Sequence, residues 1–479
     1  MIDCGIDIAE IKDILLALYP KESDDVNDAE NTLEQLTELT DDEFLNSRAC
    51  AIRTVSNNDS TFYNRLKFVY KTYCKTLDCI SCPLSKYCNA NILRLQKSYN
   101  HNAPVMVDLF CGAGGLSLGF TQQGYVTSLA NDIEPCCIDT YAHNHPEVPR
   151  KHIILGDIKG VVDKMVELLR FKDVDVVVGG PPCQGFSMAN RQRLIDDPRN
   201  HLYKEYVRAV KTIQPKFFVM ENVKGMLSVA QQVVSDFKAI GYDVAYRVVN
   251  AKDFGVPQNR ERLIYIGNRI EVDNENVFEA LSEIANKSPS YVLDDALYGL
   301  RPLVASRSRN TTEASNFENG ARIEANHAQE DNNYIKWINS GVHCSLTFNH
   351  KARYNNDRDI EIYGRLNPGD RSDDPKIADI MPYARRNGIF KDKYFKLEGD
   401  KVCKTITAHM KYDCNMYIHP YQARGLTPRE AARVQSYPDD YYFRGAYTKT
   451  YMQIGNSVPP LLGNAIAAVI KKYLGGKEQ

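Results

Sequence analysis

The sequence contains no run of eighteen apolar residues, so it offers no segment able to cross a bilayer as a helix. Its acidic amino terminus also lacks the basic and apolar regions of a signal peptide, from which we expect a cytoplasmic protein with no membrane partner. Tryptophan occurs once, and the formal net charge is −2, so total charge alone does not indicate a nucleic-acid partner. With 479 residues, the chain is long enough for two or three domains.

One cysteine follows a short, β-branched apolar run. The run spans residues 174–178 and predicts a buried strand that ends at the turn 179–187, Gly-Gly-Pro-Pro-Cys-Gln-Gly-Phe-Ser. Pro181 and Pro182 fix the backbone beside Cys183, so its sulfur needs little reorganisation to react. An isolated cysteine is more often a small buried hydrophobe, and the rest of the chain decides between these interpretations.

A glycine-rich turn follows another predicted strand. Residues 105–115 read Val-Met-Val-Asp-Leu-Phe-Cys-Gly-Ala-Gly-Gly, a strand that leads through a turn into a helix. Backbone in such a turn can approach a nucleotide cofactor closely. Asp132 ends a second predicted strand, where a carboxylate can accept hydrogen bonds from ribose hydroxyls, and Asp157 follows a third.

Acidic and basic residues lie at two further strand ends. Glu221 follows the apolar run 217–220, which places it at the same edge of the sheet as Cys183. Arg260 and Arg262 precede the strand predicted at 263–267. Since they are two residues apart on an extended backbone, they point the same way, and we expect both to reach one pocket.

In their order along the chain, these blocks resemble DNA cytosine-5 methyltransferases, which depend on S-adenosylmethionine. The predicted fold class is α/β, with a Rossmann-like S-adenosylmethionine methyltransferase sheet, a smaller target-recognition domain and an N-terminal helical, cysteine-rich extension. The resemblance also implies a set of cofactor contacts: Phe110, Gly112, Gly114, Gly115, Asp132, Ile133, Asp157, Ile158, Pro181, Asn456, Ser457 and Val458.

The resemblance implies that Cys183 attacks carbon 6 of a cytosine, which makes carbon 5 nucleophilic enough to accept the methyl group. By the same analogy, Glu221 holds or protonates the ring nitrogen N3 and Arg262 binds the exocyclic oxygen, with Arg260 in the same catalytic set. Because stacking shields carbon 6, the base must be flipped out of duplex DNA.

The carboxyl-terminal blocks complete the resemblance. Thr427 and Pro428 predict a helix start, and residues 456–458 precede an apolar helix at 461–470 that the family folds back beside its first block. The stretch 404–410, Lys-Thr-Ile-Thr-Ala-His-Met, resembles one that re-enters the DNA groove in relatives. Between residues 342 and 435 there are 17 Lys and Arg against 12 Asp and Glu, a modest excess that suits duplex DNA.

These motifs divide the chain into four parts. Residues 1–100 form an N-terminal helical extension, 101–270 the catalytic S-adenosylmethionine-binding domain, 271–423 the target-recognition region and 424–479 a part that completes the catalytic domain. The first sixty residues hold 15 acidic and 4 basic side chains, whereas residues 61–100 hold 7 basic and one acidic. Ile8, Ile11, Leu15 and Leu18 share one helical face and predict a small helical unit.

Four cysteines gather in the basic part of this extension. They are spaced C-x4-C-x2-C-x5-C and comprise Cys74, Cys79, Cys82 and Cys88. Thirteen cysteines in a cytoplasmic protein favour thiols and ligands over disulfides, so this spacing predicts a four-thiolate metal site. The segment 79–88 resembles the iron-sulfur loop of the endonuclease III family, with a first spacing of four residues in place of six. A [4Fe-4S] cluster and a zinc ion both stay open.

Three functions from different classes fit this sequence. The favoured one is a sequence-specific DNA cytosine-5 methyltransferase that acts as a monomer on duplex DNA, within a restriction-modification or defence system with its own partner proteins. The others are an RNA (tRNA) cytosine-5 methyltransferase and a catalytically silent DNA-binding regulator. The sequence does not determine the target site, the flanking bases, the oligomeric state or whether a cognate nuclease exists.

Overall fold

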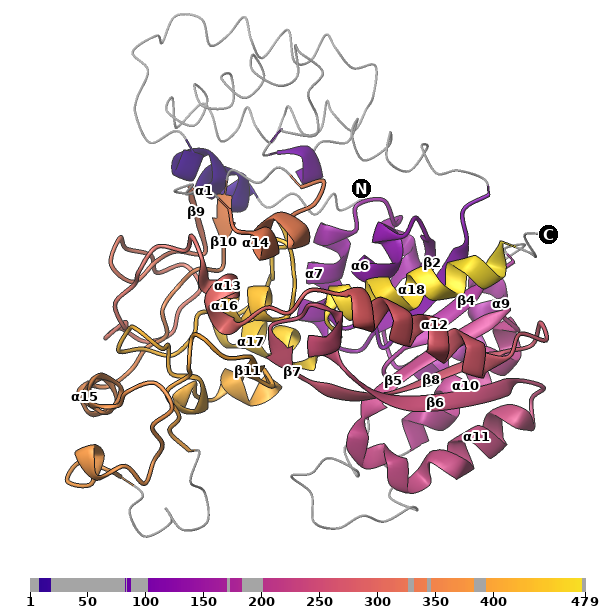
Figure 1. Ribbon diagram of the computed structural model, residues 1–479. Coiled ribbons are helices and arrows are strands. Elements are labelled where there is room, and N and C mark those ends of the chain that lie inside the picture. The colour runs from indigo at the N-terminus through magenta and orange to yellow at the C-terminus, as the bar shows by residue number, and fades with distance from the viewer. Residues whose placement is uncertain are drawn as a thin grey trace, which may run out of the picture.

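The computed structural model describes residues 8–18, 82, 84–87, 102–169, 173–182, 201–325, 331–342, 346–382 and 393–475. Its centre is a seven-stranded sheet in the order β3-β2-β1-β4-β5-β8-β6 (Figure 1). The strands are β1 (Val105–Leu109), β2 (Val126–Asp132), β3 (Ile153–Leu155), β4 (Val176–Gly179), β5 (Phe217–Val223), β6 (Asp243–Asn250) and β8 (Glu261–Asn268). Strand β8 runs antiparallel to both of its neighbours, β5 and β6, and the other pairs in this sheet are parallel.

Helices cover both faces of this sheet. One face carries α6 (Gly115–Gln122), α12 (Asn274–Lys287) and α18 (Pro460–Leu474), and the other carries α8 (Ile158–Asp163), α9 (Met165–Leu168), α10 (His201–Ile213) and α11 (Ala230–Lys238) (Figure 1). Near β2 and β3 lies α7 (Pro135–Asn144). The arrangement confirms the α/β, Rossmann-like fold class.

Both sheet faces are buried, which explains why the strands read as continuous apolar runs. Successive side chains alternate between two cores: Met106 and Val176 contact the α6, α12 and α18 side, while Val107 and Val177 contact the opposite side. The β-branched run that leads toward Cys183 therefore forms β4, as its sequence predicts.

A second, less regular part is built around two small sheets. One pairs β9 (Ile323–Ala325) with β10 (Leu346–Phe348), and the other pairs β7 (Gln258–Asn259) with β11 (Cys403–Lys404). Its helices are α13 (Leu293–Leu297), α14 (Asn333–Ile338), α15 (Asp357–Arg365), α16 (Pro428–Val434) and α17 (Tyr447–Asn456). Helix α12 contributes to the sheet core, so that core extends beyond residue 270, at which the sequence interpretation ended the catalytic domain.

The N-terminal extension is described at two places. Helix α1 (Ile8–Leu18) confirms the helix expected from Ile8, Ile11, Leu15 and Leu18, and its Ile11 and Leu15 are buried against β9 and β10. Cys82 and Leu84 join the same apolar cluster, just before a short 3₁₀ helix at Ser85–Tyr87. In the described parts of the chain, no helix has the length and apolarity that crossing a membrane requires.

The first and last helices of the sheet domain meet at glycine. A Cβ built on Gly119 of α6 would lie 2.6 Å from the carbonyl carbon of Gly463 in α18, so glycine allows the two helix backbones to touch. Thr427 caps α16 as predicted, and the apolar helix expected at 461–470 is α18. The terminal block therefore folds back beside the first.

We predict that Gly119→Ala destabilises the protein, because α6 and α18 must separate to admit a methyl group. The expected loss is about 1–3 kcal/mol of unfolding free energy, measured by urea denaturation.

Gly160→Ala is the matched control, since a Cβ at this α8 position meets nothing within 4 Å. It should leave the protein as stable as wild type or raise its stability by up to about 1 kcal/mol. Equal effects of the two substitutions would contradict the close α6–α18 contact.

Candidate active site

The turn after β1 has an unusual backbone. Phe110, Gly112 and Gly114 have φ angles of 57°, 53° and 84°, the left-handed region that glycine adopts without cost. Phe110 adopts it without being glycine, which marks a conformation imposed by its surroundings. The turned backbone directs the Gly112 N–H to Asp132 Oδ2 at 2.8 Å. The loop between β1 and α6 is therefore fixed to the end of β2.

Residues distant in sequence enclose this loop. A Cβ on Gly114 would lie within 2.9 Å of the side chains of Tyr141, His145 and Tyr441, and Gly115 is packed directly against Ser457 and Val458. The Tyr441 hydroxyl also donates to the Ala113 carbonyl. The carboxyl-terminal block thus forms one wall of the loop.

The ends of β2 and β3 present a carboxylate beside exposed apolar side chains. Asp132 accepts the N–H groups of Gly112 and Glu134, each at 2.8 Å, and burial raises its pKa. Ile133 is 65% exposed and Leu155 is 50% exposed. Exposed aliphatic groups next to a positioned acid suit a flat ring joined to a hydroxylated sugar.

The other predicted cofactor residues differ in what they expose. Asp157 is exposed and caps α8 through a 2.9 Å bond from the Lys159 N–H, whereas the Ile158 side chain is buried in the core. Pro181, Ser457 and Val458 are buried, and Asn456 is exposed at the end of α17. The Ile158 side chain therefore packs in the core, away from the exposed groups of this edge.

At the adjacent strand ends, Glu221 and Arg262 form an ion pair. The Arg262 Nε lies 2.7 Å from Glu221 Oε1, and each side chain is only 13% exposed. They are diagonal neighbours on antiparallel strands, because Val223 is the residue opposite Arg262. The structure therefore pairs Glu221 with one of the two arginines that the sequence predicted beside it.

The chain that leaves β4 is fixed against this pair. A Cβ on Gly180 would lie 2.9 Å from Glu221 Oε2, and the Asn222 side chain donates to the Pro181 carbonyl at 2.9 Å. Cys183, two residues further on, lies outside the described residues. Gly180 and Pro181, which precede it, are thus held beside Glu221 and Asn222.

Arg260 requires a correction. Its side chain is 1% exposed and donates to the carbonyls of Ile406, Gly455 and Ser457 at 2.7, 3.0 and 2.8 Å, whereas Arg262 pairs with Glu221. The expectation that both arginines reach one pocket followed from strand alternation, but residue 260 separates β7 from β8. Arg260 binds the protein backbone instead.

Comparisons with known proteins agree with this geometry. A family model described as C-5 cytosine-specific DNA methylase matches residues 105–472. The chain belongs to this family. It is 35% identical over 406 residues to the Type II methyltransferase M1.HphI of Haemophilus parahaemolyticus, covering 83% of this chain and 91% of the relative. It is 33% identical over 393 residues to M.DdeI of Desulfomicrobium norvegicum, covering 77% and 88%.

A solved structure supports the fold. It is an E. coli prophage protein described as a DNA modification methyltransferase, with a TM-score of 0.62 and 25% identity, covering 78% of this chain and all of that one. The predicted family and fold are therefore confirmed.

Sequence reasoning missed several residues of this methylase site. Asn222 directly follows Glu221 in the sequence, which was a usable signal, whereas no pattern pointed to Tyr441. Nor did the sequence distinguish Asp108 from the other residues of its predicted strand. It is buried beside the β1–α6 loop, where the Ser117 hydroxyl donates to it at 2.5 Å and lies 2.7 Å from the Tyr141 hydroxyl. Burial, opposed by the Ser117 bond and reinforced by Asp132, raises the pKa of Asp108 to about 7.

We predict that Asp108 makes stability fall as pH rises. Its ordinary pKa is 3.8 and its folded pKa is about 7, so between these values the folded chain holds the extra proton. The unfolding free energy then decreases through this window, by roughly 4 kcal/mol once both limits are passed. Asp108→Asn removes the titration, so its stability relative to wild type should increase from pH 4 to pH 8 in urea denaturation.

The exposed Asp163 supplies the matched Asp-to-Asn control, with stability expected within about 0.5 kcal/mol of wild type. Parallel pH curves for Asp108→Asn and wild type would show that Asp108 does not titrate in this window.

Proposed function

We propose that this chain transfers a methyl group from S-adenosylmethionine to carbon 5 of a cytosine flipped out of duplex DNA, through a covalent adduct with Cys183. The observation that carries the proposal is the Glu221–Arg262 pair, against which Gly180 packs as the chain leaves β4 toward Cys183. The family model, which describes a DNA methylase, favours DNA over RNA as the substrate.

The residues of the β1–α6 loop fit S-adenosylmethionine, which supplies the methyl group when bound. Exposed Ile133 and Leu155 suit the adenine ring, and Asp132 retains carboxylate lone pairs for the ribose hydroxyls beyond its two backbone bonds. Phe110, Gly112, Gly114 and Gly115 provide the close backbone approach. Pro181, Asp157, Ile158 and residues 456–458 complete the proposed set.

The catalytic roles follow from the chemistry of the ring. The Cys183 thiolate forms a bond to carbon 6, which moves electron density to carbon 5 while Glu221 stabilises N3 and Arg262 the exocyclic oxygen. After methyl transfer, the carbon 5 proton passes to a solvent water, and departure of the thiolate from carbon 6 restores the aromatic ring. Arg260 acts in this proposal as a positioning residue, because its donors are bound to carbonyl groups.

We assign target recognition to residues 271–423 with the exception of α12, and we place the enzyme in a bacterial restriction-modification system as a monomer on DNA. Both relatives named above are called Type II methyltransferases, which supports the second part. A cognate nuclease is the partner protein that such a system implies.

We predict that the wild-type protein forms a covalent adduct with a duplex that carries 5-fluorocytosine, because fluorine at carbon 5 cannot leave as a proton does. Denaturing electrophoresis with cofactor present should show the adduct, and Cys183→Ser should abolish it.

Glu221→Gln should lower the methylation rate of an unmodified duplex by about 10²- to 10⁴-fold.

Glu261→Gln is the control, since Glu261 is exposed and pairs with Lys224 at 3.0 Å.

Sequencing DNA from a methylation-free host that expresses the chain identifies the target site. Methylation of tRNA without DNA methylation would favour the RNA enzyme, and DNA binding without any methylation would favour the silent regulator. An adduct formed equally by Cys183→Ser would refute the mechanism.

We also propose the four-thiolate metal site, which the cysteine spacing alone supports. Cys74, Cys79 and Cys88 lie outside the described residues, and Cys82 is buried in the apolar cluster with α1. Among the residues that are described, no group of three or more metal-ligand side chains occurs.

Metal analysis of protein purified without oxygen tests this site. Iron with acid-labile sulfide and a brown colour would identify the cluster, whereas colourless protein with stoichiometric zinc would identify the zinc alternative. Replacing Cys79 by serine should release the metal in either case. Protein that contains neither metal would refute the site.

A further inference from the structure

Helix α1 carries a buried carboxylate. Glu10 is 0% exposed, and its Oε2 accepts from Arg322 Nη2 at 3.2 Å and lies 3.1 Å from Arg444 Nη2. Its Oε1 lies 3.9 Å from His143 Nδ1. Burial, aided by nearby cations, lowers the pKa of His143, so the two arginines supply the positive charge that a buried carboxylate needs.

Arg322, His143 and Arg444, which contact Glu10, belong to three different parts of the fold. Arg322 immediately precedes β9 in the proposed recognition region. His143 lies near the end of α7, the helix that follows the cofactor acid Asp132. Arg444 lies in the link between α16 and α17. One side chain of the N-terminal extension therefore contacts both the recognition region and the cofactor-binding domain.

The link between α16 and α17 lies between the recognition region and the cofactor-binding domain, and we call it the seam. The Asn144 side chain accepts from the Tyr442 N–H at 3.0 Å and donates to its carbonyl at 2.8 Å. From the opposite part, the Asn349 side chain does the same with Phe443, at 2.9 and 3.0 Å. Each side-chain amide thus makes the pair of backbone hydrogen bonds that a neighbouring strand would make. One amide belongs to α7 and the other to the residue after β10.

A second point of the extension reaches the same seam. The Lys86 ammonium donates to the Asp440 carbonyl at 2.8 Å and to Asn144 Oδ1 at 3.3 Å, and it lies 3.2 Å from the Asp440 carboxylate. Between these polar contacts, α1 buries apolar side chains against both strands of the small sheet and Tyr442. The cluster contains Ile11, Ile14, Leu15, Cys82, Leu84, Ile323, Leu346, Phe348 and Tyr442.

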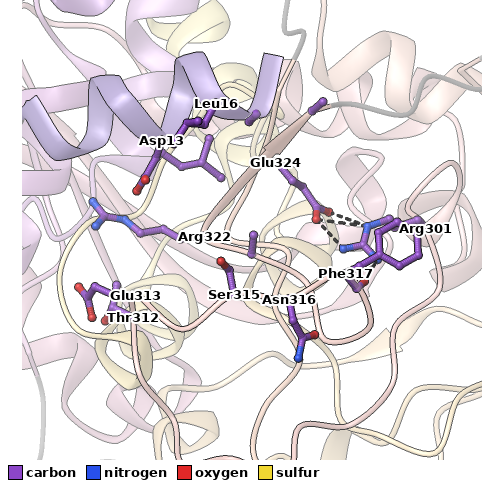
Figure 2. A pocket seen from close by; sticks show the side chains of 14 residues that line it. Asp13, Leu16, Arg301, Thr312, Glu313, Ser315, Asn316, Phe317, Arg322 and Glu324 are labelled. Carbon is purple, nitrogen blue, oxygen red and sulfur yellow. Dashed lines mark hydrogen bonds and ion pairs between the residues drawn. The ribbon is translucent and has the colours of Figure 1, made fainter. Parts of the chain in front are cut away.

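On its other side, α1 borders a hollow. Leu16 and Asp13 line a cavity of about 460 Å³. Figure 2 shows these two residues opposite Phe317, while the Arg322 side chain extends toward the helix. Leu16 is 40% exposed and Phe317 is 80% exposed. The helix is therefore held by the face that carries Glu10, Ile11 and Leu15.

We infer that Glu10 is a positioning residue for target recognition: through Arg322 and Arg444 it fixes the recognition region against the cofactor-binding sheet. This inference rests on the proposed methylation of duplex DNA. Loss of the contact lets β9 and β10 move relative to the seam, which weakens the fit to DNA, whereas the cofactor loop keeps its own contacts.

The test compares Glu10→Gln with wild type in steady-state methylation of a target duplex. KM for the duplex should rise by about fivefold or more, the range of a typical coupling between distant sites. The dissociation constant for S-adenosylmethionine and kcat should stay within about twofold of wild type. Hydrogen exchange should increase at residues 323–325 and 346–348 and stay unchanged in β1 and β2.

Two further variants separate positioning from general damage. Arg322→Lys keeps the charge but loses the guanidinium geometry, so it should shift KM in the same direction by less and remain folded. Glu275→Gln removes a carboxylate paired with Arg247 in solvent and should behave as wild type. An unchanged KM and exchange pattern in Glu10→Gln, or an equal loss of cofactor affinity, would overturn the inference. Wild-type protein inactive on DNA would instead overturn the proposed function.

Discussion

The guanidinium of Arg260 joins segments that are far apart in the chain, and the geometry of the site depends on it. Its three acceptors are the carbonyl of Ile406, which follows β11, and the carbonyls of Gly455 and Ser457 around the end of α17. A buried cation is costly unless its donors are bound, and these carbonyls compensate its two terminal nitrogens, whereas its Nε has no hydrogen-bond partner among the described residues. Lysine could not replace it, since an ammonium lacks the rigid planar fork that spans three acceptors. The segment after β11, the residue that precedes β8 and the end of α17 therefore meet at one side chain.

Local patterns predicted what local physics determines. Apolar runs placed β1, β4 and β5, because both faces of the sheet are buried, and Thr427 with Pro428 predicted the start of α16. Glu221 and Arg262 were found because motif residues at strand ends share one edge of the sheet. The partners of Arg260 and Glu10 could not be predicted in this way. The carbonyls bound by Arg260 lie 146 to 197 residues away in the sequence, and Arg322, which donates to Glu10, lies 312 residues away. No period or spacing encodes such pairings.

Helix α16 shows how this fold buries charge. Arg424 donates twice to Glu430, at 2.8 and 2.6 Å, and Arg433 donates to Asp439 at 2.7 Å. Burial alone would raise the pKa of Glu430, but the facing Arg424 holds it below its usual range. Because these charges are paired and hydrogen-bonded, a charged helix can lie inside the core next to α13 and α17. Breaking one partner would leave the other charge uncompensated, so these pairs fix a single arrangement of the helices.

The cofactor loop and the seam share a short stretch of chain. Tyr441 donates to the Ala113 carbonyl in the loop, while the next two residues, Tyr442 and Phe443, are held by Asn144 and Asn349. A movement of the recognition region that pulls on Phe443 therefore reaches the loop through two peptide units. The contact between Gly115 and Ser457 limits that movement, because α18 packs on α6 and resists separation. The β1–α6 loop and the part that contains β9 and β10 are thus linked by covalent neighbours but stabilised by separate contacts.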